Sequence, residues 1–249
     1  MAICIKSIQE IQIMREGGKK LATIFKILTK EAKAGVTLRK LNQISEKIAY
    51  KLKAQPAFKN YNEFPASLCA SVNETVVHGV PAGYKLKNGD VLGLDFGLLY
   101  KGYYTDMAIT VGIGKISFKA QDLIKTTKKA LYQAIKKVKP NKHIGDIAFS
   151  IQSFAEKRGY SVVRALVGHG IGKKLHENLA VPNFGKKGEG EKIIKGMTFT
   201  IEPMIVVGQC HVKTGPDRFS VITVDGEISA HFEHTVAVTE RGCEILTKQ

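Results

Sequence analysis

The order of helix-like and strand-like segments repeats once along this sequence, and the repeat constrains the fold more than any other feature. Apolar residues recur at spacings of three and four, as amphipathic helices require, in two pairs of segments. The predicted helices cover residues 7–32, 37–52, 117–138 and 144–158. Extended segments follow each pair. We therefore predict an α+β protein with two similar halves, roughly residues 1–112 and 113–249, in one domain over residues 1–249.

Four acidic residues occupy matching places in the two halves. The segments DMAITV and EHTVAV begin at Asp106 and Glu233, and each ends in a valine five residues later. The other two acids, Asp95 and Glu202, each follow a glycine by six residues. Chance can match one such offset, but several matches in the same order indicate a true repeat. We expect each half to bring two carboxylates to a shared centre.

The stretch Val91–Val111 predicts two strands joined by a tight turn at Lys101-Gly102. A loop of two or four residues places Asp95 and Asp106 on one face, within about 5–8 Å of each other at Cβ. A three-residue loop places them on opposite faces. In a further alternative, one aspartate belongs to the turn and the other to a strand end.

Carboxylates inside apolar strands need a compensating positive charge, since an unpaired buried charge costs several kcal/mol. No Lys or Arg shares these strand interiors, so metal ions are the simplest answer. His169, between two glycines in GHGIG, adds one nitrogen ligand. Four carboxylates and one imidazole suffice for two cations, and the set suits Mn, Fe or Co better than a thiolate-type zinc site.

The other histidines have less informative surroundings. His78 ends an extended run in VVHGVP, and His176 closely follows the glycines of GHGIG. Either is a surface-loop residue or a group that holds a substrate amide and stabilises a tetrahedral intermediate. The remaining histidines are interpreted as structural: His143, His211, His231 and His234.

Composition limits the cellular setting. No apolar run is long enough to span a bilayer, and the N-terminus has no apolar signal region, so we expect a soluble, cytoplasmic protein. The net charge of +16 reflects either a biased composition or residence near a polyanion such as ribosomal RNA. Four widely spaced cysteines predict reduced thiols.

Several motifs together give a specific family resemblance. They are NETVVHGVP, GDVLGLD, GYYTD, GHGIG, HEN, GMTFTIEPM and EHTVAVTERGCEIL. Through them the whole chain resembles the methionine aminopeptidases of the short bacterial type I class. The resemblance implies the pita-bread fold, in which two αββ halves, related by a pseudo-twofold axis, form a central antiparallel sheet with helices on its outer face.

The resemblance also implies an activity and a metal centre. The activity is removal of the initiator methionine from nascent chains with a small second residue, by water that two divalent ions activate (Co, Mn, Fe, Zn or Ni). Asp95 would chelate one ion, and His169 with Glu202 the other. Asp106 and Glu233 would bridge both ions. A monomer is expected, and ribosome association through the basic surface is a further hypothesis.

Roles for the substrate follow from the same resemblance. Glu202 would accept a proton from the attacking water, His78 would hydrogen-bond near the scissile amide, and His176 would contact the scissile carbonyl oxygen. The methionine pocket would include Tyr61, Phe64, Cys69, Leu175 and Phe219.

This chain departs from the usual family pattern at four positions. They are Phe58, often a smaller residue; Leu175, often aromatic; Met107, usually a hydroxyl residue; and Leu179, usually proline. We expect the first two to reshape the pocket rim and the others to tune rate or metal affinity. The short interval from His169 to Glu202 and the lack of an N-terminal extension favour the minimal enzyme. The alternatives are an Xaa-Pro aminopeptidase-like enzyme of the same fold, or a non-catalytic protein that binds ribosomes or RNA.

Overall fold

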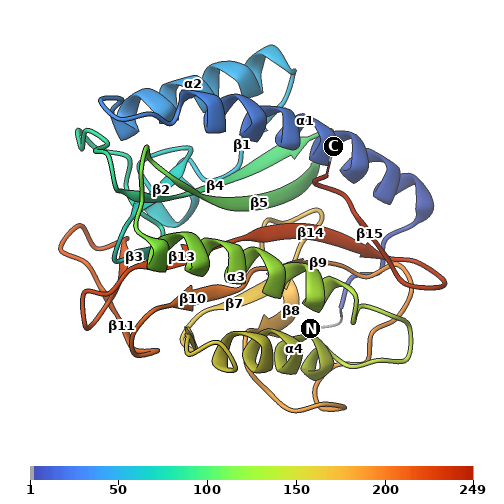
Figure 1. Cartoon of the computed structure of the whole chain (residues 1–249). Helices are drawn as coiled ribbons and strands as arrows, with labels where there is room; N and C mark the ends of the chain where they lie inside the picture. Colours follow the sequence, from blue (N-terminus) through green and yellow to red (C-terminus); the bar gives the residue numbers. More distant parts are fainter. Residues whose placement is uncertain (1–2, 249) are drawn as a thin grey trace.

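Two pairs of helices dominate the computed structural model, which describes residues 3–248 (Figure 1). They are α1 (Ile8–Glu31), α2 (Leu38–Lys51), α3 (Phe118–Ile135) and α4 (Ile144–Glu156). Side chains of Ser7, Thr37 and Ser117 cap three of them by accepting a backbone hydrogen bond from three residues further on. The predicted helices are confirmed, apart from small shifts at their ends. Within residues 3–248, no helix has the length and apolar character that crossing a membrane requires.

A large antiparallel sheet joins the two halves. Its main strands follow the order β1–β4–β5–β14–β9–β7–β8, while β2 pairs with β4 and β15 pairs with β14. The strands are β1 (Gln55–Pro56), β2 (Cys69–Val72), β4 (Val91–Tyr100), β5 (Tyr103–Gly112), β7 (Val167–Gly170), β8 (Glu177–Pro182), β9 (Thr198–Ile201), β14 (Glu233–Val238) and β15 (Cys243–Ile245). The halves meet where β5 lies beside β14.

Short strands pair segments that are far apart in the sequence. One small sheet contains β3 (Thr75–Val77), β11 (Val212–Thr214) and β12 (Val221–Thr223). Another contains β6 (Ser161–Val162), β10 (Met204–Val206) and β13 (Ser229–His231). A 3₁₀ turn, η1 (Tyr61–Glu63), precedes β2. The first of these sheets ties loops of the second half to β3 of the first half, while the second lies entirely within the second half.

The helices cover one face of the large sheet. In Figure 1, α1 and α2 lie over β4 and β5, and α3 and α4 lie over the other half. Leu94 and Phe96 of β4 pack in the core beside α1 and α2, while Phe199 and Val236 pack in the core beside α3 and α4. Successive side chains on a strand point to opposite faces. The acids between these apolar residues therefore point away from the helices.

Candidate functional site

The hairpin of β4 and β5 fixes the relative position of the first two carboxylates. Tyr100 pairs with Tyr103, so the turn contains only Lys101 and Gly102. Of the loop lengths that the sequence left open between these strands, the structure has the two-residue loop. Asp95 pairs with Ala108 and Asp106 pairs with Gly97, which makes the two aspartates diagonal neighbours on one face.

The second half places its two acids beside the first pair. Glu233, the first residue of β14, pairs with Ala108 from the opposite side of β5 to Asp95. His234, the next residue, pairs with Ile201, and Glu202 directly follows Ile201 at the end of β9. Four acids from consecutive strands thus converge on the face of the sheet that the helices leave free.

His169 on β7 is held with one ring nitrogen turned to these acids. Its backbone N–H donates to Thr200 Oγ1 at 3.0 Å, and its Nδ1 lies 3.0 Å from the Gly170 carbonyl oxygen. A carbonyl only accepts, so Nδ1 carries the proton and Nε2 keeps its lone pair. Nε2 lies 3.8 Å from Glu202 Oε1. Burial lowers the pKa of His169 to about 3, so the ring is neutral, as a metal ligand must be.

The acids are deeply buried and lack cationic partners. Asp95, Asp106 and Glu233 are at most 9% exposed. Within residues 3–248, no Lys or Arg forms an ion pair with these three or with Glu202. In the same part of the chain, Asp95 Oδ1 and Glu233 Oε1 are buried without a hydrogen-bond partner. Such atoms are costly unless a cation satisfies them.

Burial and mutual repulsion perturb the whole cluster. Burial, followed by the neighbouring carboxylates, raises the pKa values of Asp95 and Glu233 well above their usual range. Burial raises the pKa of Asp106 to about 7, and burial with the Asp106 charge raises that of Glu202 to about 8. One ligand atom each of Asp106, His169 and Glu233 lie within 4.8 Å of one another. The donor set and its spacing fit divalent cations.

A cavity of about 380 Å³ opens onto these acids. All twelve residues predicted for the site line it: Tyr61, Phe64, Cys69, His78, Asp95, Asp106, His169, Leu175, His176, Glu202, Phe219 and Glu233. The predicted pocket residues belong to one apolar cluster, in which the rings of Phe64 and Phe219 meet edge to face at 5.6 Å between centroids. The cavity thus has an apolar wall beside a carboxylate-rich floor, an arrangement suited to a ligand with an apolar group next to a polar one.

His78 and His176 lie at the exposed rim of this cavity. The ring of His176 stands edge-on to that of His169, with 4.1 Å between centroids, and its Nδ1 lies 2.8 Å from the Tyr61 hydroxyl. His78 has a positive φ of 57°, an unusual backbone conformation for a residue other than glycine. Both histidines therefore present ring nitrogens at the edge of the cavity.

His231, interpreted from the sequence as structural, lies beside Glu202 in the structure. The residue is 3% exposed, and its Nε2 lies 3.8 Å from Glu202 Oε2 without a hydrogen-bond partner in residues 3–248. One signal was available: His231 stands two residues before Glu233, a spacing that in an extended chain shares one face. Six residues that line the cavity were given no role from the sequence. They are Asn62, Val77, Ala165, Leu166, Val167 and Met204.

Comparisons with known proteins match the chain almost from end to end. Residues 12–240 match the family model of metallopeptidase family M24. The methionine aminopeptidase of Clostridium perfringens is 44% identical over 245 residues, which cover 98% of each chain. Methionine aminopeptidase 1 of Bacillus subtilis is 42% identical over 248 residues and covers both chains fully. The crystal structure of methionine aminopeptidase from Thermotoga maritima matches with a TM-score of 0.98 and 40% identity, with full coverage of both chains.

Proposed function

We propose how this chain, which belongs to metallopeptidase family M24, removes methionine from the N-termini of proteins. The family, the pita-bread fold and the aminopeptidase activity predicted from the sequence are confirmed by the relatives that match its full length. The observation that carries the proposal is the cavity, where four carboxylates with raised pKa values adjoin an apolar wall. We propose further that residues 1–249 form a single catalytic domain; of these, residues 1, 2 and 249 lie outside the described part.

A metallopeptidase of this family binds divalent metal. We propose that two ions per chain would be held here: Asp95 would be a ligand of one, His169 and Glu202 would be ligands of the other, and Asp106 and Glu233 would be shared. The buried carboxylate oxygens without partners support this arrangement, because a cation supplies the charge that the protein omits. Oxygen ligands with one imidazole suit Mn, Fe, Co, Ni or Zn. When bound, such ions activate water and polarise a carbonyl group.

The remaining roles belong to the side chains around the cavity. Glu202 lines the cavity and accepts the proton of the attacking water. His78 hydrogen-bonds the substrate near its scissile amide. We propose that His176 donates from Nε2 to the scissile carbonyl oxygen, with Nδ1 as the acceptor in its 2.8 Å contact with the Tyr61 hydroxyl.

The methionine side chain of the substrate enters the apolar part of the cavity. Its walls are Tyr61, Phe64, Cys69, Leu175 and Phe219. Phe58 also lines the cavity and touches the same cluster. We propose that substrates carry a small second residue, as the sequence resemblance implies.

The cellular setting is part of the proposal. A monomeric enzyme would act on nascent chains in the cytoplasm, and its charge of +16 would favour contact with ribosomal RNA. A hollow beside α3 and α4 gathers basic side chains for this contact: Lys136, Lys137, Lys139, Lys142, Lys157, Arg158 and Lys187. Sedimentation with ribosomes should weaken as salt rises. Association that salt does not change, or no association, would remove the ribosome from the proposal.

Peptide hydrolysis tests the function directly. Protein reconstituted with metal should release methionine from Met-Gly and Met-Ala peptides but not from peptides with a bulky second residue. Free methionine is measured by chromatography, and protein treated with a chelator is the control. Cleavage of Xaa-Pro bonds instead would favour a proline-specific peptidase, and no cleavage would contradict the assignment.

A further inference from the structure

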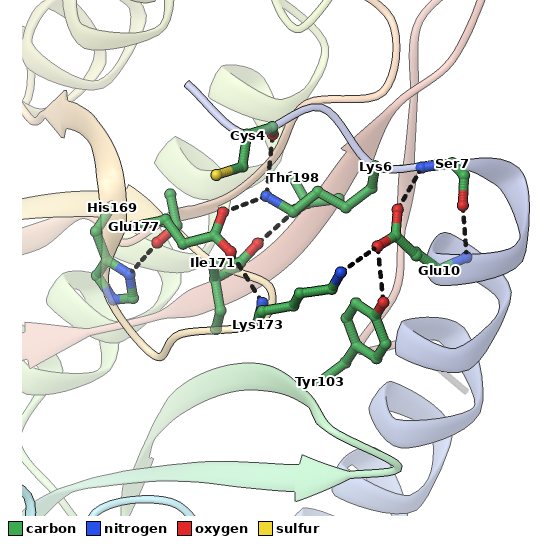
Figure 2. Close-up of polar contacts among 11 residues, drawn as sticks. Cys4, Lys6, Ser7, Glu10, Tyr103, His169, Ile171, Lys173, Glu177 and Thr198 are labelled. Atoms are coloured by element: carbon green, nitrogen blue, oxygen red, sulfur yellow. Dashed lines mark hydrogen bonds and ion pairs between the residues drawn. The ribbon is translucent and has the colours of Figure 1, made fainter. Parts of the chain in front are cut away.

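Lys6 and Glu177 form an ion pair whose side chains are only 4% and 5% exposed (Figure 2). Lys6 Nζ also donates to the Cys4 carbonyl at 3.0 Å, and the Lys6 backbone N–H donates to the Gly196 carbonyl at 2.8 Å. A buried pair gains little net stability, because desolvation of both charges offsets their attraction. The position of the pair therefore needs another explanation.

The pair lies against the loop between β7 and β8, which carries His176. Glu177 is the next residue, and its Oε1 accepts from the Lys173 backbone N–H at 2.8 Å. A Cβ added at Gly172 would lie 2.4 Å from Lys6 Cε and 2.6 Å from Glu177 Oε1, so the loop backbone is pressed against the pair. A side chain at this position would displace the ends of the Lys6 and Glu177 side chains. The loop conformation is thus tied to the Lys6–Glu177 contact.

A second ion pair reaches the same loop from outside. Lys173 Nζ lies 3.2 Å from Glu10 Oε1, which also accepts from the Tyr103 hydroxyl at 2.7 Å (Figure 2). The Lys173 side chain is 69% exposed, however, so water and salt screen this contact. Of these two ion pairs on one loop, the first is buried and the second is exposed, so the second provides a matched control.

We propose that the Lys6–Glu177 pair positions His176 for catalysis. The pair attaches the loop to the N-terminal segment that contains Lys6. This attachment keeps the His176 ring aligned with the scissile carbonyl in the transition state. The inference rests on the role proposed above for His176. A displacement of about 1 Å at a catalytic group can cost roughly 10²-fold in rate. Because the contact strengthens in the transition state, its loss lowers kcat more than it changes KM.

The test compares metal-reconstituted variants on a Met-Ala peptide. Lys6→Met should lower kcat roughly 10- to 100-fold while KM and the metal content per chain stay near wild type. Lys173→Met, the exposed control on the same loop, should retain wild-type kcat. In a His176→Ala background, Lys6→Met should cause no further loss, since the pair acts only through that ring.

A double variant separates positioning from simple destabilisation. Lys6→Met alone leaves Glu177 buried without its cation, which can unfold the protein. Lys6→Met with Glu177→Gln removes both charges and keeps an acceptor for the Lys173 N–H. It should recover wild-type melting temperature but not wild-type kcat. Recovery of both would overturn the proposal.

The outcomes also distinguish this inference from the proposed function. If His176→Ala lowers kcat and Lys6→Met does not, or if their effects multiply, only the positioning role fails. If His176→Ala leaves kcat unchanged, the role of His176 fails and the positioning role fails with it. If the wild-type protein releases no methionine, the function itself is wrong.

Discussion

Asp95 and Glu233 flank Ala108 on adjacent strands, and each has an oxygen that no protein donor reaches within residues 3–248. Their burial and mutual repulsion make the metal-free site unfavourable when the carboxylates are charged. The negative charges that repel one another in the metal-free site attract a divalent cation. The buried carboxylate charges are therefore the cause both of the site's affinity for metal and of its instability without metal.

Glu233→Gln tests this balance, because it removes a charge and keeps the shape of the side chain. We expect metal affinity to fall at least about tenfold, since even indirect partners of a metal site contribute that much. The metal-free variant should melt at a higher temperature than metal-free wild type, as one repulsive charge is gone. Titration calorimetry and thermal melts measure both effects. Glu240→Gln, on the exposed surface, is the control; unchanged affinity and stoichiometry in Glu233→Gln would contradict the ligand role.

The sequence predicts the acids better than it predicts their surroundings. Asp95 and Glu233 are recognisable because a carboxylate in an apolar strand requires a countercharge. His231 is different: its spacing to Glu233 indicates a shared face, but its approach to Glu202 also depends on the pairing of β10 with β13, which no local pattern specifies. Contacts between distant segments therefore limited the residue-level prediction.

At the scale of elements, the β4–β5 turn decides whether two of the carboxylates share a face. Lys101 and Gly102 both have positive φ, of 48° and 82°, as a type I′ turn requires. A Cβ at Gly102 would meet no atom within 4 Å, so a substitution there changes only the backbone preference. A mutation at Gly102 therefore tests the backbone conformation of the turn without adding a side-chain contact.

Gly102→Ala should lower the free energy of unfolding by about 1–2 kcal/mol, the cost of left-handed backbone for a residue with a Cβ. Urea denaturation measures the change. Lys101→Asn is the matched control and should be neutral or slightly stabilising, because asparagine tolerates this conformation better than lysine. Equal stability of Gly102→Ala and wild type would show that the turn does not constrain the hairpin.

The start of α1 offers a pH-dependent test. Hydrogen bonds from the Ser7 backbone N–H, then the Tyr103 hydroxyl and the Lys173 ammonium, lower the pKa of Glu10 from its usual 4.5 to about 2. A lowered pKa gives stability that is present above pH 4.5 and is lost as the pH falls towards 2. Wild type should therefore exceed Glu10→Gln in stability at pH 6, with the difference shrinking towards pH 3. Urea denaturation across this range measures it, and a constant difference would contradict it.

The helical spacing of apolar residues was the most reliable sequence signal, even where glycines lower the local helix propensity. Gly17-Gly18 lies inside α1 and lowers its helix propensity, yet the helix is continuous. A Cβ at Gly18 would lie 2.1 Å from the Leu246 carbonyl oxygen, so glycine lets the C-terminal segment pack against the helix. Such tertiary contacts also explain why β11 and β12 were not predicted individually: each is three residues long and is defined by its partners.

At the scale of the whole molecule, the site lies where the two halves meet. β5 carries Asp106 and β14 carries Glu233, and these neighbouring strands come from different halves. Asp95 and Glu202 extend the arrangement outwards on β4 and at the end of β9. A cation bound among these acids therefore links both halves, and its removal should affect global stability rather than a single loop.

Chelation should lower the melting temperature more at pH 8 than at pH 6. In the metal-free site the pKa of Asp106 is raised to about 7 and that of Glu202 to about 8, chiefly by burial. A raised carboxylate pKa means that stability is retained at low pH, where the group is protonated, and is lost as the pH rises through the folded value. Bound cations neutralise the charges of these carboxylates, so the metal-loaded protein does not lose stability as they ionise. Calorimetric melts with and without chelator, at both pH values and constant ionic strength, measure the difference, and re-added metal should restore the melting temperature. An equal shift at both pH values, or a larger shift at pH 6, would show that the carboxylate cluster does not control the stability of the metal-free protein.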